Sequence, residues 1–177
     1  VGSLFSANNI AKYLKSQRAT ISPQSVLNYL KPLTNAFFVY KVMRFDISGL
    51  KLFEVGEKYY FEDLGLRNSI RGFDRRKDIN KVMENAVYLH LIRLGYNVYV
   101  GQLGAAEIDF VAQKNGNTIY VQVAYMLTDE NTVQREFGNL LKIDDNYRKY
   151  VVTMDDYNAG SNYNGIDRNN FPLFIKE

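Results

Sequence analysis

Apolar residues recur every three to four positions near the start of the chain, a spacing that predicts amphipathic helices. One helix is expected over residues 7–16, where Ser6 is placed as the N-cap. A second helix is expected to begin at Pro23, because proline suits the first helical position and Ser22 precedes it as a cap. The chain therefore opens with two short helices.

Two runs of aromatic and β-branched residues follow, 37–45 and 58–61, and they predict a pair of strands. Helix, turn, helix and hairpin in this order indicate a winged helix, which we assign to residues 1–72. The charged stretch GFDRRKD, residues 72–78, has no apolar periodicity and predicts a domain boundary.

Residues 79–177 predict a second module. A helix begins at Ile79 and ends at Gly95, and three strands, a helix and a further strand follow it. The polar tail, 155–170, is typical of a loop. The expected fold class is therefore α/β (α+β): a winged helix-turn-helix followed by a restriction-endonuclease-like α/β sandwich with a mixed sheet.

The dipeptide Asn115-Gly116 lies between two alternating apolar runs and predicts a two-residue hairpin turn, because both central positions need positive φ. Asp109 then lies opposite Gln122. Side chains alternate between the two faces of a strand. One face of the hairpin is expected to carry Glu107, Asp109, Val111, Tyr120, Gln122 and Ala124. The other face, expected to be the buried one, carries Ile108, Phe110, Ala112, Ile119, Val121 and Val123.

A carboxylate beside a second oxygen donor suits Mg²⁺, and a lysine two positions further on would complete a site for phosphodiester hydrolysis. The pattern resembles the PD-(D/E)XK nuclease superfamily. In this resemblance Glu84 matches the acidic residue of the first helix, Asp109 the aspartate, and Gln122-Val123-Ala124 the (D/E/Q)-x-K motif. The departure is Ala124, because a methyl group cannot supply a lysine's charge.

Nearly the whole chain also resembles the C-terminal region of prokaryotic AAA-type ATPases, where a winged helix precedes a domain of unknown function with this nuclease-like fold. The matching segments are VGSLFSANNIAKYLKS, AFFVYKVMRFDISG, EKYYFEDLGLR, VMENAVYLHLIRLGYNVYVG, EIDFVAQ and REFGNLLKIDDNYRKYVVTMDD. The chain has no Gly-x-x-x-x-Gly-Lys-Ser/Thr phosphate loop. The resemblance therefore implies that ATP binds an upstream ATPase domain of the same polypeptide, and that this chain is a fragment beginning inside the winged helix.

The expected function is a regulatory or targeting portion of such an ATPase, with a nuclease-like domain that does not cut DNA. Glu84, Asp109 and Gln122 would bind Mg²⁺ weakly, and no lysine is expected near enough to replace Ala124. Gln134 or Arg135 on the following helix could point back over the sheet. An active Mg²⁺-dependent nuclease is the first alternative, and a protein-interaction module with neither DNA nor metal is the second.

The distribution of charge bears on DNA binding. Residues 1–78 carry 13 Lys and Arg against 7 Asp and Glu, whereas 79–177 carry 9 against 12. A basic first module fits double-stranded DNA as a partner. The expected contacts are Gln24, Ser25, Asn28 and Lys31 in the major groove, with Arg44 and Lys51 on phosphates. The alternative, that this module packs on the ATPase core instead, stays open.

Composition excludes several classes of protein. The chain has no cysteine, which excludes disulfide scaffolds and thiolate metal sites and fits a reducing cytoplasm. No apolar run approaches the roughly 20 residues that span a bilayer, so no membrane partner is expected. The single histidine, His90, has no second imidazole to join it as a metal ligand and is expected to pack in the core.

Overall fold

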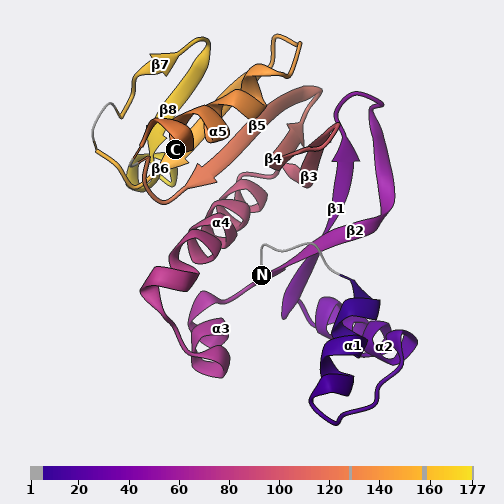
Figure 1. Ribbon diagram of the computed structural model, residues 1–177. Coiled ribbons are helices and arrows are strands. Elements are labelled where there is room, and N and C mark those ends of the chain that lie inside the picture. Colours follow the sequence, from indigo (N-terminus) through magenta and orange to yellow (C-terminus); the bar gives the residue numbers. More distant parts are fainter. Residues whose placement is uncertain (1–5, 128, 157–158, 177) are drawn as a thin grey trace.

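The computed structural model describes residues 6–127, 129–156 and 159–176, with the backbone only at 54 and 55. Within these residues the chain forms a mixed eight-stranded sheet with helices on both faces (Figure 1). The strand order is β2-β1-β3-β4-β5-β6-β8-β7. The predicted α+β architecture with a mixed sheet is confirmed at this level.

Side-chain caps fix where most of the helices begin. Ser6, Ser22, Asp63, Asp74 and Asp129 each accept a hydrogen bond from a backbone N–H of the first turn, which satisfies a donor that the helix leaves unpaired. The helices are α1 (Ala7–Ser16), α2 (Pro23–Asn35), α3 (Leu64–Arg71), α4 (Arg75–Arg93), α5 (Glu130–Leu141) and α6 (Phe171–Phe174). The predicted starts of α1 and α2 are confirmed, whereas α3 has no counterpart in the sequence analysis.

The strands are β1 (Val39–Asp46), β2 (Lys51–Phe61), β3 (Asn97–Leu103), β4 (Ala106–Lys114), β5 (Asn117–Ala124), β6 (Arg148–Thr153), β7 (Asn162–Tyr163) and β8 (Ile166–Asn170). The tail expected to be a loop instead adds β7 and β8, and β8 pairs in parallel with β6. This correction has a physical reason. β8 reads Ile-Asp-Arg-Asn-Asn and has little apolar alternation, so its pairing depends on the exposed edge of β6 rather than on its own composition.

The hairpin β1–β2 belongs to the common sheet. β1 pairs in parallel with β3 from Arg44↔Val100 to Asp46↔Gln102. The two strands assigned from sequence to residues 1–72 therefore continue the sheet of residues 79–177. The winged-helix assignment and the division into two modules stay predictions. The boundary stretch 72–78 contains the first turn of α4, which begins four residues before the expected Ile79.

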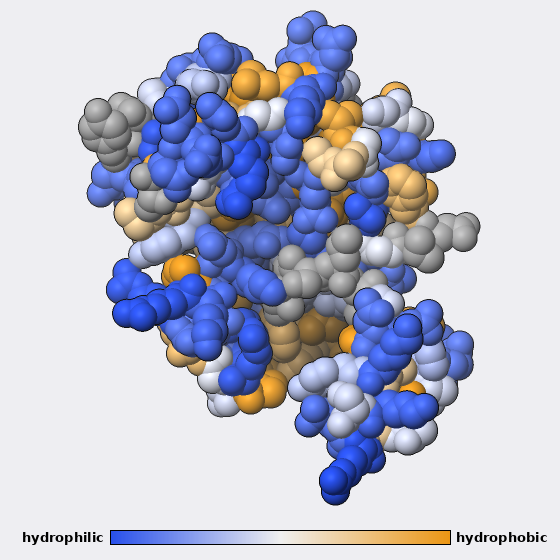
Figure 2. All heavy atoms as spheres, in the orientation of Figure 1, coloured by the Kyte–Doolittle hydropathy of each residue, from blue (hydrophilic) through white to orange (hydrophobic). Residues whose placement is uncertain are grey.

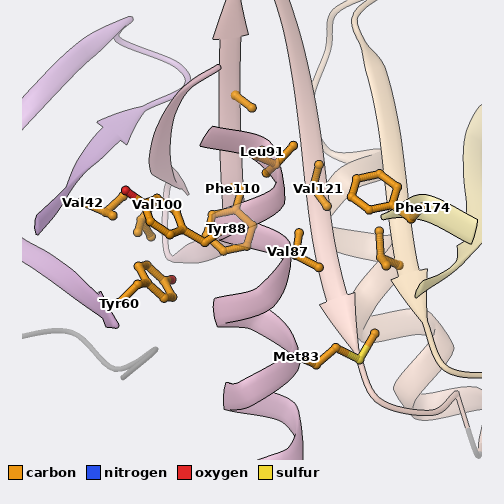
Figure 3. Packing of buried hydrophobic residues seen from close by; sticks show 12 residues of the cluster. Val42, Tyr60, Met83, Val87, Tyr88, Leu91, Val100, Phe110, Val121 and Phe174 are labelled. Atoms are coloured by element: carbon orange, nitrogen blue, oxygen red, sulfur yellow. The ribbon is translucent and has the colours of Figure 1, made fainter. Parts of the chain in front are cut away.

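Two apolar clusters lie on the two sides of the sheet. On one side, α4 packs Val87, Tyr88 and Leu91 against Tyr60 and Phe110 (Figure 3). The rings of Tyr60 and Tyr88 stack with centroids 4.7 Å apart. On the other side, α5 packs Phe137 and Leu140 against Ile108, Val111 and Tyr120. Both faces of the β4–β5 hairpin are therefore buried, and the expectation of a single buried face is wrong.

No helix within the described residues is long and apolar enough to cross a membrane.

Candidate functional site

The β4–β5 hairpin has the predicted register. Lys114 pairs with Asn117 and the pairing continues to Phe110↔Val121, around a turn in which Asn115 and Gly116 have φ of 51° and 79°. The positive φ values at both central positions are those that the Asn-Gly dipeptide predicts. This register brings the ends of β4 and β5 that carry the candidate site residues side by side.

A β-bulge lies in β4 at the site. Tyr99 pairs with Val111 but Gly101 pairs with Ile108, so two residues of β4, Asp109 and Phe110, lie opposite one residue of β3. The alternation of side chains therefore shifts by one position before the bulge. Ile108 packs with Val111 rather than with Phe110, and the predicted faces of Glu107 and Ile108 are wrong. A bulge commonly re-aims a side chain next to a functional site.

The pairing of β4 with β5 also changes at Asp109. The regular ladder ends at Phe110↔Val121, and side chains make the next bonds. The backbone N–H of Asp109 donates to Gln122 Oε1 at 3.2 Å, and the N–H of Val123 donates to Asp109 Oδ2 at 2.8 Å. Asp109 and Gln122 are therefore neighbours, as predicted, and each is oriented by the other strand.

Glu84 reaches the same place from α4. Its residue is 9% exposed, and its Oε1 accepts from Tyr60 Oη at 2.5 Å and from Lys58 Nζ at 3.0 Å. Lys58 Nζ also lies 2.8 Å from Glu107 Oε1. Lys58 is 1% exposed, so its charge is balanced by these carboxylates rather than by water.

The sequence analysis did not expect a lysine at this cluster, and the structure places Lys58 against Glu84. Lys58 comes from β2, which sequence analysis had placed in the other module. A signal was available in the sequence, because Lys58 and Tyr60 are two positions apart and so share one face of the strand. A lysine on the buried face of a strand is rare unless it is paired, and it indicates a carboxylate cluster nearby.

Electrostatic effects link the members of the cluster. Burial raises the pKa of Asp109 well above its ordinary value, and the charge of Glu84 raises it further, while the Lys58 ammonium lowers it. Burial would lower the pKa of Lys58, but the surrounding carboxylates, Glu84 foremost, outweigh burial and hold this pKa above its ordinary value. The site is therefore a group of strongly interacting charges in a poorly solvated place.

A cleft of about 530 Å³ lies over this cluster. It is lined by residues of α4, β4, β5 and α5: Asn80, Glu84, Asp109, Gln122, Val123, Ala124, Tyr125, Met126, Thr132, Arg135 and Glu136. Arg135 lines the cleft as the sequence suggested, and its Nη2 lies 2.6 Å from Glu136 Oε1. Gln134 is exposed and is not part of the lining. Lys58 is likewise absent from the lining, although its ammonium contacts Glu84, which is part of it.

The donor chemistry fits a hard divalent cation. Glu84, Asp109 and Gln122 all offer oxygen, and the Gln122 carboxamide oxygen keeps a second lone pair beside its bond to the Asp109 N–H. In the part of the chain that the structure describes, no three His, Cys, Asp or Glu side chains are grouped so as to hold a metal ion. The candidate donor set is therefore two carboxylates and an amide.

A larger cleft, of about 960 Å³, surrounds the Asn115-Gly116 turn at the other end of the hairpin. The partly buried Asp145 lines it and accepts from Tyr120 Oη at 2.6 Å and from Lys149 Nζ at 3.1 Å. These contacts tie the loop after α5 to β5 and β6. The cleft over Asp109 remains the better candidate, because it is where the carboxylates converge.

The residues predicted to contact DNA do not converge. Gln24, Ser25, Asn28 and Lys31 lie on α2, where Gln24 Nε2 donates to Asn28 Oδ1 at 3.1 Å. Arg44 lies in the second half of β1, and Lys51 is the first residue of β2. Figure 1 shows α2 and the β1–β2 turn at opposite ends of β1. Figure 2 shows hydrophilic atoms over most of this face, so hydropathy does not single out one DNA-facing surface.

His90 packs in the core, as expected. Its residue is 5% exposed, its ring lies 5.4 Å from that of Phe174, and its Nδ1 is 3.1 Å from Arg93 Nη2.

No family model matches the chain. Two uncharacterised proteins are similar to it. One, from Haemophilus influenzae, is 40% identical over 153 residues, which is 86% of this chain and 37% of that protein. The other, MJ1544 from Methanocaldococcus jannaschii, is 26% identical over 161 residues, covering 85% of this chain and 35% of that protein. The chain spans a little over a third of the length of these relatives.

Among solved structures, the chain is similar to protein VC1899 from Vibrio cholerae, with 13% identity and a TM-score of 0.35 over 96% of this chain and 47% of that one.

Proposed function

We propose that this chain carries a divalent-metal-dependent phosphodiesterase site that acts on nucleic acid. The observation that carries the proposal is that Glu84, Asp109 and Gln122, from α4, β4 and β5, line one cleft. All three were expected at such a site from the resemblance to PD-(D/E)XK nucleases. The sequence analysis expected an inactive site because of Ala124; the active alternative is supported by Arg135, a cation that lines the cleft, and by the contact of Lys58 with Glu84.

The roles follow from the contacts. Asp109 and Gln122 would hold the metal with Glu84, and the metal when bound would polarise a phosphate oxygen and activate water. The N–H of Val123 fixes Asp109 Oδ2, and the N–H of Asp109 fixes Gln122 Oε1, so the donors are oriented before any ligand arrives. Arg135 lines the cleft as an exposed cation and would contact a phosphate.

The test is nicking of supercoiled plasmid by the purified chain in Mg²⁺ or Mn²⁺, with EDTA as a blank. Asp109→Asn should lower the nicking rate by about a hundredfold or more, because it removes a ligand charge. Asp144→Asn is the matched control, since this aspartate is exposed and lies outside the cleft over Asp109. Nicking that is absent, or equal in the wild type and Asp109→Asn, would overturn the proposal.

We also propose that this site belongs to the C-terminal portion of an AAA-type ATPase, with a regulatory or targeting role. One support is the resemblance in the order of the matching segments. The other is the length of the two relatives, because the matched region occupies only 37% of one and 35% of the other. That leaves room for an ATPase core outside the matched region. The test is ATP hydrolysis by the intact Haemophilus influenzae relative, and no hydrolysis would contradict the proposal.

A further inference from the structure

Lys58 and Tyr60 bring β2 into contact with the candidate site. Both side chains bond to Glu84 Oε1, Lys58 at 3.0 Å and Tyr60 at 2.5 Å. Lys58 also reaches Glu107 on β4, although β1 and β3 separate β2 from β4 in the sheet order. A strand that is not adjacent to β4 in the sheet therefore supplies the cation that contacts Glu84 and Glu107.

Acidic side chains outnumber basic ones around the candidate site. Four carboxylates are linked by the contacts and charge interactions described above: Glu84, Glu107, Asp109 and Glu136. Two cations contact members of this group, Lys58 and Arg135. The excess of acidic groups favours a cation as ligand.

Ala124 and Lys58 differ in their relation to the cleft. Ala124 lines the cleft with Glu84 and Asp109, whereas Lys58 contacts Glu84 without lining the cleft. A lysine at position 124 would therefore bring its charge to the cleft that Glu84 and Asp109 line.

We propose that Lys58 supplies, from β2, the positive charge that the PD-(D/E)XK pattern places at position 124. This inference rests on the proposed function. Lys58 does not line the cleft, so it is a positioning residue: its ammonium offsets the repulsion between Glu84 and the neighbouring carboxylates and holds Glu84 toward the cleft. The hairpin β1–β2 is therefore part of the site, and residues 79–177 alone would lack the ammonium that contacts Glu84.

Stabilisation of the fold by an ion pair is not a sufficient reason for a buried lysine at position 58. Replacing a buried ion pair by apolar residues of similar volume is often neutral or stabilising. The ammonium of Lys58 contacts two carboxylates, one of which, Glu84, faces the cleft. The Lys58 ammonium is therefore placed where it offsets the repulsion between these two carboxylates.

The experiment removes the positive charge at position 58 and introduces one at position 124, in the intact chain. Lys58→Met should lower the metal-dependent nicking rate by about a hundredfold to a thousandfold, as does the loss of a preorganised charge elsewhere. The double variant Lys58→Met/Ala124→Lys should recover at least about tenfold of that loss. Lys41→Met is the matched control, because this lysine of β1 pairs with Glu57 and lies outside the cleft.

A second readout needs no metal. In EDTA, Lys58→Met should lower the melting temperature by about 5–15 °C, because it leaves Glu84 buried without its cation. The double variant should regain part of this loss, whereas Ala124→Lys by itself should not stabilise the chain. Circular dichroism at 20 °C establishes that each variant is folded before its rate is measured.

The outcomes separate the two proposals. If the wild type does not nick but the double variant regains stability in EDTA, the proposed function fails while the shared location of the two charges stands. If Lys58→Met is folded and nicks within threefold of the wild type, the role of Lys58 is overturned. The role is also overturned if the double variant recovers neither rate nor stability.

Discussion

Asp109→Asn should make the protein more stable and should abolish the metal binding that we propose for this site. Asp109 is held among like charges, and burial together with Glu84 raises its pKa well above the ordinary value. Asparagine keeps the acceptor for the Val123 N–H, which lies 2.8 Å from Asp109 Oδ2, so the hairpin contact survives. Relief of a buried charge of this kind should stabilise by about 1 kcal/mol, or about 2–4 °C in melting temperature.

The sign of the pH dependence follows from the raised pKa. Between the ordinary aspartate pKa of about 3.9 and the raised value, the folded chain binds more protons than the unfolded chain, so wild-type stability falls as pH rises. The advantage of Asp109→Asn should therefore be small near pH 4 and grow toward pH 8. The assay is thermal unfolding of both proteins in EDTA across this range. An Asp109→Asn variant that is less stable than the wild type at every pH would refute the reasoning.

Three further predictions concern the turn, the bulge and DNA. Gly116→Val should destabilise by about 1–3 kcal/mol, because Gly116 has φ of 79°, and an unchanged midpoint in urea would contradict the hairpin geometry. Gly101→Ala should cost about 1–3 kcal/mol by the same assay, since its Cβ would lie 2.8 Å from Val111 Cγ2 and 2.9 Å from Ile108 Cβ. A stability equal to wild type would mean that the strands opposite the bulge are loosely packed. Lys31→Ala should flatten the salt dependence of duplex binding by about one unit in fluorescence anisotropy, and an unchanged slope would remove α2 from the DNA interface.

Much of the fold could be predicted from short stretches of the sequence. Ser6 and Ser22 mark helix starts because a side-chain oxygen before an amphipathic run satisfies the first backbone donors. Asn115 and Gly116 determine the register of β4 and β5, because the turn forces positive φ at both positions. From that register, the adjacency of Asp109 and Gln122 followed directly.

The features that the sequence did not predict depend on pairing between strands that are far apart in the chain. Such pairing leaves little signal in the sequence of either strand. The bulge at Asp109 depends on how β4 meets β3, so period-2 alternation placed Ile108 and Glu107 on the wrong faces. The parallel pairing of β1 with β3 joins segments more than fifty positions apart, and nothing in either strand specifies it. The position of Lys58 in the site was missed for the same reason.

The most direct test of the central claim is a crystal structure of the wild-type chain soaked in Mn²⁺, with anomalous scattering locating the ion. We expect one ion in the cleft, coordinated by Asp109 and by at least one of Glu84 and Gln122, with Lys58 still in contact with Glu84. Anomalous density that is absent from this cleft, at Mn²⁺ concentrations that occupy other carboxylates of the chain, would contradict it.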